Sequence, residues 1–201
     1  PTIMVLQLQK ALGQAHFSTT IKADFYLSQG YQFIVSFEVP GGGFSLWGDP
    51  PADRMLSAYG LMELVDMAEV RPVDEDLIQR TAGWLLDQQN PDGTWDNDQG
   101  LVHETSWSRL EDSHLPVTAY VTWALIRAGY AEDSRTQDGL NYVQTYLDRA
   151  KDPYVLALCA NALVSADPGD AATQTAVDRL AQAAVVQDDV AFWPSGIATF
   201  V

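Results

Sequence analysis

The chain has 201 residues, enough for one domain with a substantial buried core. Its 11 Lys and Arg stand against 27 Asp and Glu, and the net charge of −16 argues against nucleic-acid backbones or anionic membrane surfaces as partners. Hydrophobic residues make up 47% of the sequence without an apolar run of about 18 residues, which indicates a folded domain that does not insert into a membrane.

Cys159 is the single cysteine, so an internal disulfide is excluded. It lies in an apolar helical run, where we expect a small buried hydrophobic side chain. The chain begins at Pro1, directly at a helical pattern, and has neither an initiator Met nor a signal peptide. We interpret it as a piece of a longer polypeptide whose targeting signal lies elsewhere.

Apolar residues recur with helical periodicity along the whole chain, and no window alternates with period two, so we expect no sheet. Ser18, Thr19 and Thr20 are the expected caps of the second helix, and Gly30 in its interior predicts a close approach by another helix. The expected helices cover Pro1–Gly13, Thr20–Val39, a segment between Asp53 and Pro72, a segment that begins at Val73–Asp76, Leu115–Tyr130, Thr136–Ala150, Pro153–Ala166 and Ala171–Gln187.

One segment, Arg80–Trp95, combines the end of a helix, two glutamines, a tight turn and a tryptophan. Its turn, Asn90–Gly93, contains a proline that fixes φ and a glycine that accepts a positive φ. Trp95 then returns to the fold as a large apolar side chain whose N–H needs a partner. Weaker copies of this unit occur at Gly41–Gly48 and Val190–Pro194.

The spacing of these units predicts the architecture. Gly43 and Gly93 are 50 residues apart, and Trp95 and Trp193 are 98 apart, about twice that. A unit of this length is one helical hairpin, which buries its apolar face only by stacking on neighbours. We therefore predict a single all-α domain over residues 1–201, either a solenoid or an α/α toroid of stacked helical hairpins. The large aromatic residues after the turns favour the toroid, in which they would wedge between adjacent hairpins. The chain would then form part of the ring.

Of the three histidines, His16 and His114 are expected to be structural residues in connections. His103 lies in a long irregular segment, a kind of loop that often carries function. Metal-ligand spacing, a serine-nucleophile elbow and a phosphate-binding glycine loop are absent, so we expect no metal and no cofactor. Asp96 and Asp98 are expected on a solvated turn, where they and Asn97 would chelate a cation only weakly.

Two families of α/α toroids share parts of this pattern. The run Gln88-Gln89…Gly93-Thr94-Trp95 resembles the QW repeat of squalene and oxidosqualene cyclases. A cyclase also needs an Asp-x-Asp-Asp acid in a deep apolar cavity, and the nearest approach here, Glu111–His114, does not match it. A third alternative is a toroid that acts as a binding module without covalent chemistry.

The wider pattern resembles the thioester-containing domain of bacterial alpha-2-macroglobulin-like proteins, relatives of the complement thioester proteins. The matching segments occur in order along most of the chain: Gln29–Gln32, Glu38–Gly48, Leu56–Leu64, Arg80–Trp95 and Val117–Leu125. The resemblance implies part of a broad-spectrum endopeptidase inhibitor, not an enzyme, at the periplasm or cell envelope or secreted. Its implied partners are target proteases and neighbouring domains of the same polypeptide.

In that family a Gly-Cys-x-Glu-Gln motif forms an internal thioester, which bait cleavage exposes to nucleophiles. This chain contains no such motif, and the resemblance places it just before Pro1. Val102-His103-Glu104 resembles the segment whose histidine attacks the thioester in some complement members, although their acid two residues after the histidine is Thr105 here. His103 and Glu104 are thus the implied thioester-proximal residues. The aromatic residues implied to shield the thioester from water are Phe44, Trp47, Trp95 and Trp107.

Overall fold

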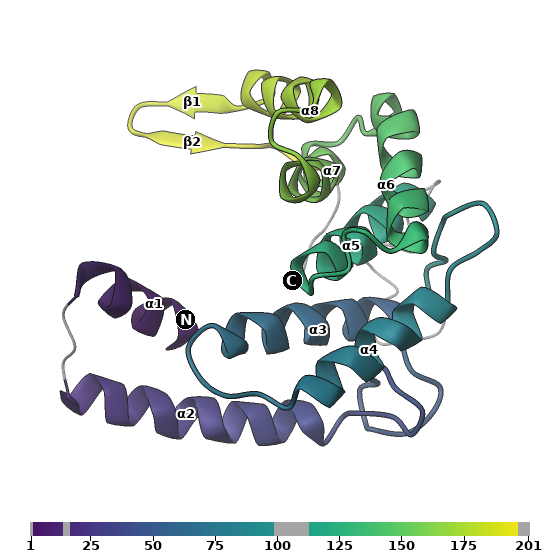
Figure 1. Cartoon of the computed structure of the whole chain (residues 1–201). Helices are drawn as coiled ribbons and strands as arrows, with labels where there is room; N and C mark the ends of the chain where they lie inside the picture. Colours follow the sequence, from purple (N-terminus) through teal and green to yellow (C-terminus); the bar gives the residue numbers. More distant parts are fainter. Residues whose placement is uncertain (1, 14–16, 99–112, 197–201) are drawn as a thin grey trace. The chain divides into compact units, whose positions relative to one another are not determined.

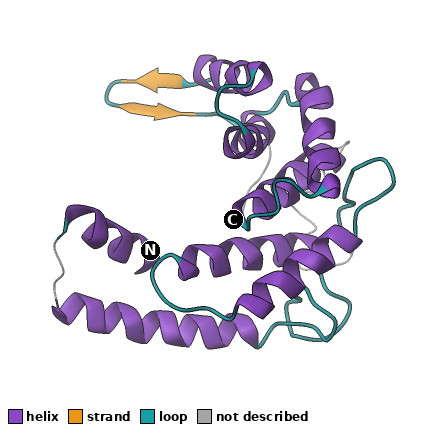
Figure 2. Ribbon diagram, viewed as in Figure 1, coloured by secondary structure: helices purple, strands orange, loops and turns teal. Residues whose placement is uncertain are grey.

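A computed structural model describes residues 2–13, 17–98 and 113–196 of the chain (Figures 1 and 2). The chain divides into two compact units, Pro1–Trp84 and Leu85–Val201, and the boundary between them lies inside a helix. The single domain predicted for residues 1–201 stays a prediction, and the two units are described in turn.

The first unit is built from helices and one long loop. Its elements are α1 (Thr2–Leu12), α2 (Phe17–Val35), α3 (Arg54–Ala68) and most of α4 (Glu75–Asp87). Phe44, Leu64 and Leu77 form its buried core, and partly buried side chains of α2 pack against them. Phe44 holds the loop between α2 and α3 in place, because its backbone pairs with both Glu38 and Asp53.

The second unit contains the end of α4, four further helices, a short 3₁₀ turn and a β-hairpin. Its elements are α5 (His114–Arg127), α6 (Ser134–Tyr146), η1 (Leu147–Arg149), α7 (Pro153–Ala166), α8 (Ala171–Gln182), β1 (Val185–Gln187) and β2 (Val190–Phe192). Helix α5 is buried along most of its length and packs against α6 and α7. Cys159 of α7 is fully buried in this core, which confirms the expected hydrophobic role.

Aspartate side chains cap several helices. Asp53 accepts a hydrogen bond from Leu56 N at the start of α3. Asp133, Asp152 and Asp170 cap α6, α7 and α8 in the same way. A side-chain cap of this kind stabilises a helix by about 1 kcal/mol, because it pairs an N–H that the helix itself cannot. Part of the acidic excess therefore has a structural use beyond solubility.

The all-α prediction is confirmed for the described residues, with one exception at the C-terminal end. The expected helix Ala171–Gln187 is wrong, because α8 ends at Gln182 and a two-stranded antiparallel hairpin follows. Val, Ile and aromatic residues pack well in strands, and Asp188 adopts a positive φ of 52° in the turn. The expectation of no sheet was therefore wrong at this point.

Two details of α2 also differ from expectation. The helix begins at Phe17, so Ser18, Thr19 and Thr20 lie in its first turn rather than at its cap. A Cβ on Gly30 would meet only Met67 Cε, at 3.9 Å, so the predicted close approach is wrong. The crowded helix glycine in this unit is Gly60, whose Cβ would come within 2.8 Å of the Phe44 ring.

Candidate functional site

The predicted thioester-proximal residues, His103 and Glu104, lie outside the described residues, as do Trp107 and His16. Their roles stay predictions. Two described residues near the ends of that segment are Asp96, which follows Trp95, and His114, the first residue of α5. His114 Nδ1 lies 3.6 Å from Asp96 Oδ1, and both side chains are about half-exposed.

The turn before Trp95 is held by its own polar side chains. Asp92 Oδ1 accepts hydrogen bonds from Thr94 Oγ1 at 2.7 Å and from Thr94 N at 3.2 Å. These bonds hold the pKa of the Asp92 carboxyl below its usual value, and the nearby His114 contributes in the same direction. Gln89 Nε2 donates to both Gly93 O and Arg135 O, so it ties the turn to the start of α6.

Trp95 is fully buried in the second unit. Its indole Nε1 donates to Leu85 O at 2.7 Å, and its backbone N–H donates to Thr118 Oγ1 at 3.1 Å. A Cβ on Gly139 of α6 would come within 2.8 Å of the indole ring. Trp95 therefore packs between α4, α5 and α6, and its predicted shielding role stays a prediction.

Phe44 occupies a similar position in the first unit, with 3% of its surface exposed. Its backbone N–H donates to Ser57 Oγ at 2.8 Å, and its ring lies on Gly60. Phe44 and Trp95 thus share one device: an aromatic residue after a turn, with its N–H paired to a hydroxyl on the next helix.

Trp47 differs from both, because 79% of its surface is exposed. The loop that carries it is fixed on either side of the indole. Ser45 N donates to Phe37 O at 3.1 Å, and Gly48, at a φ of 76°, lies so close to Ser36 O that a Cβ would come within 2.7 Å of it. The indole is therefore presented to solvent from a well-anchored loop.

A second exposed aromatic lies at the same end of α2. Phe33 is 66% exposed and makes an edge-to-face contact with Phe37, with 4.7 Å between the ring centroids. Apolar periodicity did not single out Phe33, because periodicity reports which residues are apolar and not which of them are covered. Phe33, Phe37 and Trp47 are named the Trp47 patch below.

Cys159 is unsuited to thioester chemistry. Burial raises the pKa of its thiol to about 12, so the nucleophilic thiolate is scarce at neutral pH. Within the described ranges, no group of three or more His, Cys, Asp or Glu side chains is arranged to hold a metal ion. The same part of the chain contains no helix that is both long and apolar enough to cross a membrane.

Comparison with known proteins identifies the family of this chain. A family profile described as "A-macroglobulin TED domain" matches residues 1–198. Thioester-containing protein 1 allele S1 of Anopheles gambiae is 24% identical over 168 residues, which is 82% of this chain and 12% of that protein. Ovostatin of Gallus gallus is 28% identical over 133 residues, 65% of this chain and 9% of that protein. The chain thus spans only a small part of these relatives, and it belongs to the A-macroglobulin TED domain family.

Proposed function

We propose that this chain is the greater part of the thioester-containing domain of an alpha-2-macroglobulin-like endopeptidase inhibitor. The observation that carries the proposal is the family match over residues 1–198. The same match argues against the cyclase alternative. The chain carries no Gly-Cys-x-Glu-Gln motif. The thioester itself would come from a segment before Pro1, where the resemblance to the family places this motif.

The chain's own contribution would be to keep water away from the thioester until bait cleavage. Trp47 suits this task best, because its exposed indole sits on an anchored loop and is available to pack against a neighbouring domain. Phe33 and Phe37, at the end of α2 to which this loop is anchored, add further apolar surface. A large, rigid aromatic side chain of this kind excludes water and contributes strongly to an interface.

The parent protein would act stoichiometrically and not as an enzyme, with target proteases and its own neighbouring domains as partners. Similarity to thioester-containing protein 1 and to ovostatin supports a secreted protein. The periplasm or cell envelope of a bacterium is the more specific hypothesis.

Methylamine labelling of the full-length parent protein tests the thioester, since an intact thioester incorporates the amine and releases a free thiol. In that protein, Trp47→Ala should raise the rate of spontaneous thiol release about tenfold, the effect of losing one interface anchor. Tyr59→Ala is the matched control, because Tyr59 is an exposed aromatic of α3 that lies outside the Trp47 patch. Equal rates for the two variants would contradict the shielding role.

A parent protein that neither incorporates methylamine nor carries the Gly-Cys-x-Glu-Gln motif would favour the thioester-less binding module instead. In a protein that does react, His103→Ala should shift the preference between amine and hydroxyl acceptors, because an acyl-imidazole intermediate directs transfer to hydroxyls. An unchanged preference would leave His103 a structural residue.

A further inference from the structure

The loop after α2 returns to the end of that helix and is held there on both sides of Trp47. Before the indole, Ser45 N donates to Phe37 O at 3.1 Å. After it, Gly48 lies against Ser36 O, and a Cβ on this glycine would come within 2.7 Å of that oxygen. The two contacts fall on consecutive residues, so one short piece of backbone holds the loop before and after Trp47.

That piece of backbone is itself fixed to the last turn of α2. Ser36 N donates to Gln32 O at 3.1 Å, and Ser36 Oγ donates to Phe33 O at 2.7 Å. Phe37 N donates to Ile34 O at 3.0 Å. A carbonyl on a backbone held in this way has little room to move aside for an added methyl group, so the loop would have to move instead.

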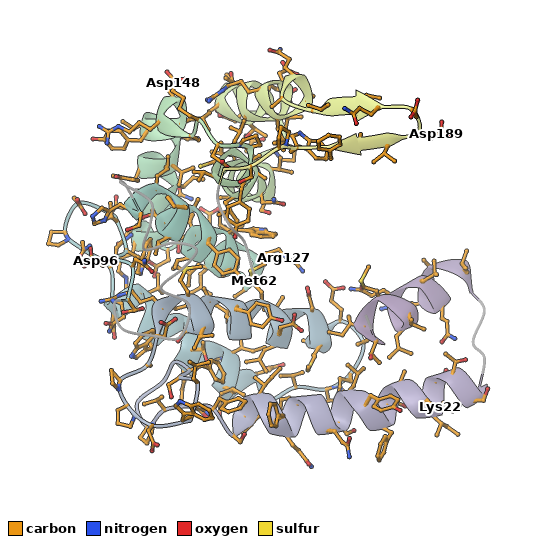
Figure 3. All side chains as sticks on the ribbon, turned by 180° about the vertical axis from the view of Figure 1, so that it is seen from behind. Lys22, Met62, Asp96, Arg127, Asp148 and Asp189 are labelled. Atoms are coloured by element: carbon orange, nitrogen blue, oxygen red, sulfur yellow. The ribbon has the colours of Figure 1, made fainter. Side chains whose placement is uncertain are left out.

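A second glycine of the same loop differs from Gly48 in its surroundings. Gly41 and Gly48 both have a positive φ, 100° and 76°, which other residues rarely adopt. A Cβ on Gly41 would meet nothing within 4 Å, whereas one on Gly48 would collide with Ser36 O. Of the two, Gly48 alone therefore combines this backbone conformation with a close approach to the end of α2. In Figure 3, Lys22 marks the start of α2, and the loop follows the opposite end of the helix.

We propose that Gly48 is a positioning residue for Trp47. Its close approach to Ser36 fixes the backbone directly after the indole, and hence the direction in which the indole leaves the loop. This inference rests on the proposed function, in which Trp47 shields the thioester. A side chain that is already in place loses little conformational freedom when a neighbouring domain covers it, so the interface is stronger.

Fluorine NMR of the 201-residue chain labelled with fluorotryptophan tests the positioning without involving the thioester. The chain has six tryptophans, and Trp47→Phe identifies the Trp47 resonance. Gly48→Ala should shift or broaden that resonance, because the added Cβ forces the loop away from Ser36. Gly41→Ala is the matched control, since it has the same positive-φ cost in open space, and it should leave the resonance in place. A resonance that Gly48→Ala does not move, or that Gly41→Ala moves as much, overturns the proposal.

A measurement on the wild type covers the case in which Gly48→Ala does not fold. Backbone NMR relaxation should give the amides from Ser45 to Gly48 the same order parameters as those of α2, about 0.85 for a rigid backbone. Order parameters below about 0.6, which are typical of a flexible loop, would overturn the proposal.

The full-length parent protein tests the consequence for the shield. Gly48→Ala should raise the rate of spontaneous thiol release about threefold to tenfold, up to the effect of Trp47→Ala, and Gly41→Ala should not. In a Trp47→Ala background, Gly48→Ala should add nothing further, because it acts through the indole. A further increase in that background would show that Gly48 acts on the fold as a whole, and would overturn the positioning role.

Failure of this inference and failure of the proposed function have different signatures. If Trp47→Ala raises thiol release but Gly48→Ala moves the Trp47 resonance without raising it, the positioning role is wrong and the shield stands. If Trp47→Ala has no effect on thiol release, the shielding function is wrong, and the NMR results alone decide whether Gly48 holds the loop.

Discussion

The backbone N–H of Trp95 points at the Thr118 side chain, with 3.1 Å between N and Oγ1, in a fully buried part of the second unit. Phe44 and Ser57 repeat this relationship in the first unit, at 2.8 Å. In both places a buried hydroxyl near the start of a helix accepts a hydrogen bond from a backbone N–H of the preceding loop.

Thr118→Val should therefore destabilise the chain by about 1–3 kcal/mol, because it removes the acceptor and leaves a buried N–H unpaired. Thr118→Ser keeps the acceptor and loses only a methyl group, so it should cost less. Urea unfolding followed by tryptophan fluorescence measures both variants. Equal stability of the valine and serine variants would show that the hydrogen bond contributes nothing.

Helix glycines should respond to alanine with opposite signs. Gly60→Ala and Gly139→Ala place a Cβ within 2.8 Å of the Phe44 and Trp95 rings, so both should destabilise, by about 1–3 kcal/mol for an overpacked core. Gly83 in α4 has open space at the same position, so Gly83→Ala should stabilise by about 0.4–1 kcal/mol. Thermal unfolding of the three variants compares them directly, and a uniform sign would contradict the packing described here.

Cys159 should be inert in the folded chain and reactive once it unfolds. Burial raises the pKa of its thiol to about 12, from a value near 9 in the unfolded chain. The unfolded state then loses this proton at a lower pH than the folded state, so stability from this group is complete below pH ~9 and is lost as the pH rises towards 12. Cys159→Ala should flatten that part of the pH–stability profile, and thiol reagents should label the wild type only in denaturant.

Gln89 and Gln88 are neighbours in sequence with different contacts. Gln89 Nε2 bridges Gly93 O, at 3.1 Å, and Arg135 O, at 2.7 Å. Gln89→Ala should cost about 1–2 kcal/mol because two partly buried carbonyls lose a donor. Gln88→Ala is the adjacent control and should cost less. Hydrogen exchange at the start of α6 provides a local readout, since it should speed up in the Gln89 variant.

The helical regions were predictable because apolar periodicity and the Asn90–Gly93 turn are local signals, and the aromatic residues after the turns revealed the repeat. The β-hairpin was not, because each strand has three residues and the turn is Asp-Asp without glycine, so nothing in the window separates it from a helix end. Phe44 and Trp47 also look alike in sequence. Only the fold shows that one is 3% and the other 79% exposed, because exposure depends on which residues distant in sequence cover each ring.

Trp95 and Trp193 make the same indole contact in different surroundings. Each Nε1 donates at 2.7 Å to the carbonyl of a leucine two residues before a helix ends, Leu85 in α4 and Leu180 in α8. Trp95 is fully buried, whereas 46% of the Trp193 surface is exposed to solvent. The two indoles therefore fluoresce from different environments, Trp95 from an apolar site and Trp193 from a solvated one. A molecule that binds over the base of the hairpin should shift the emission of Trp193 towards that of Trp95.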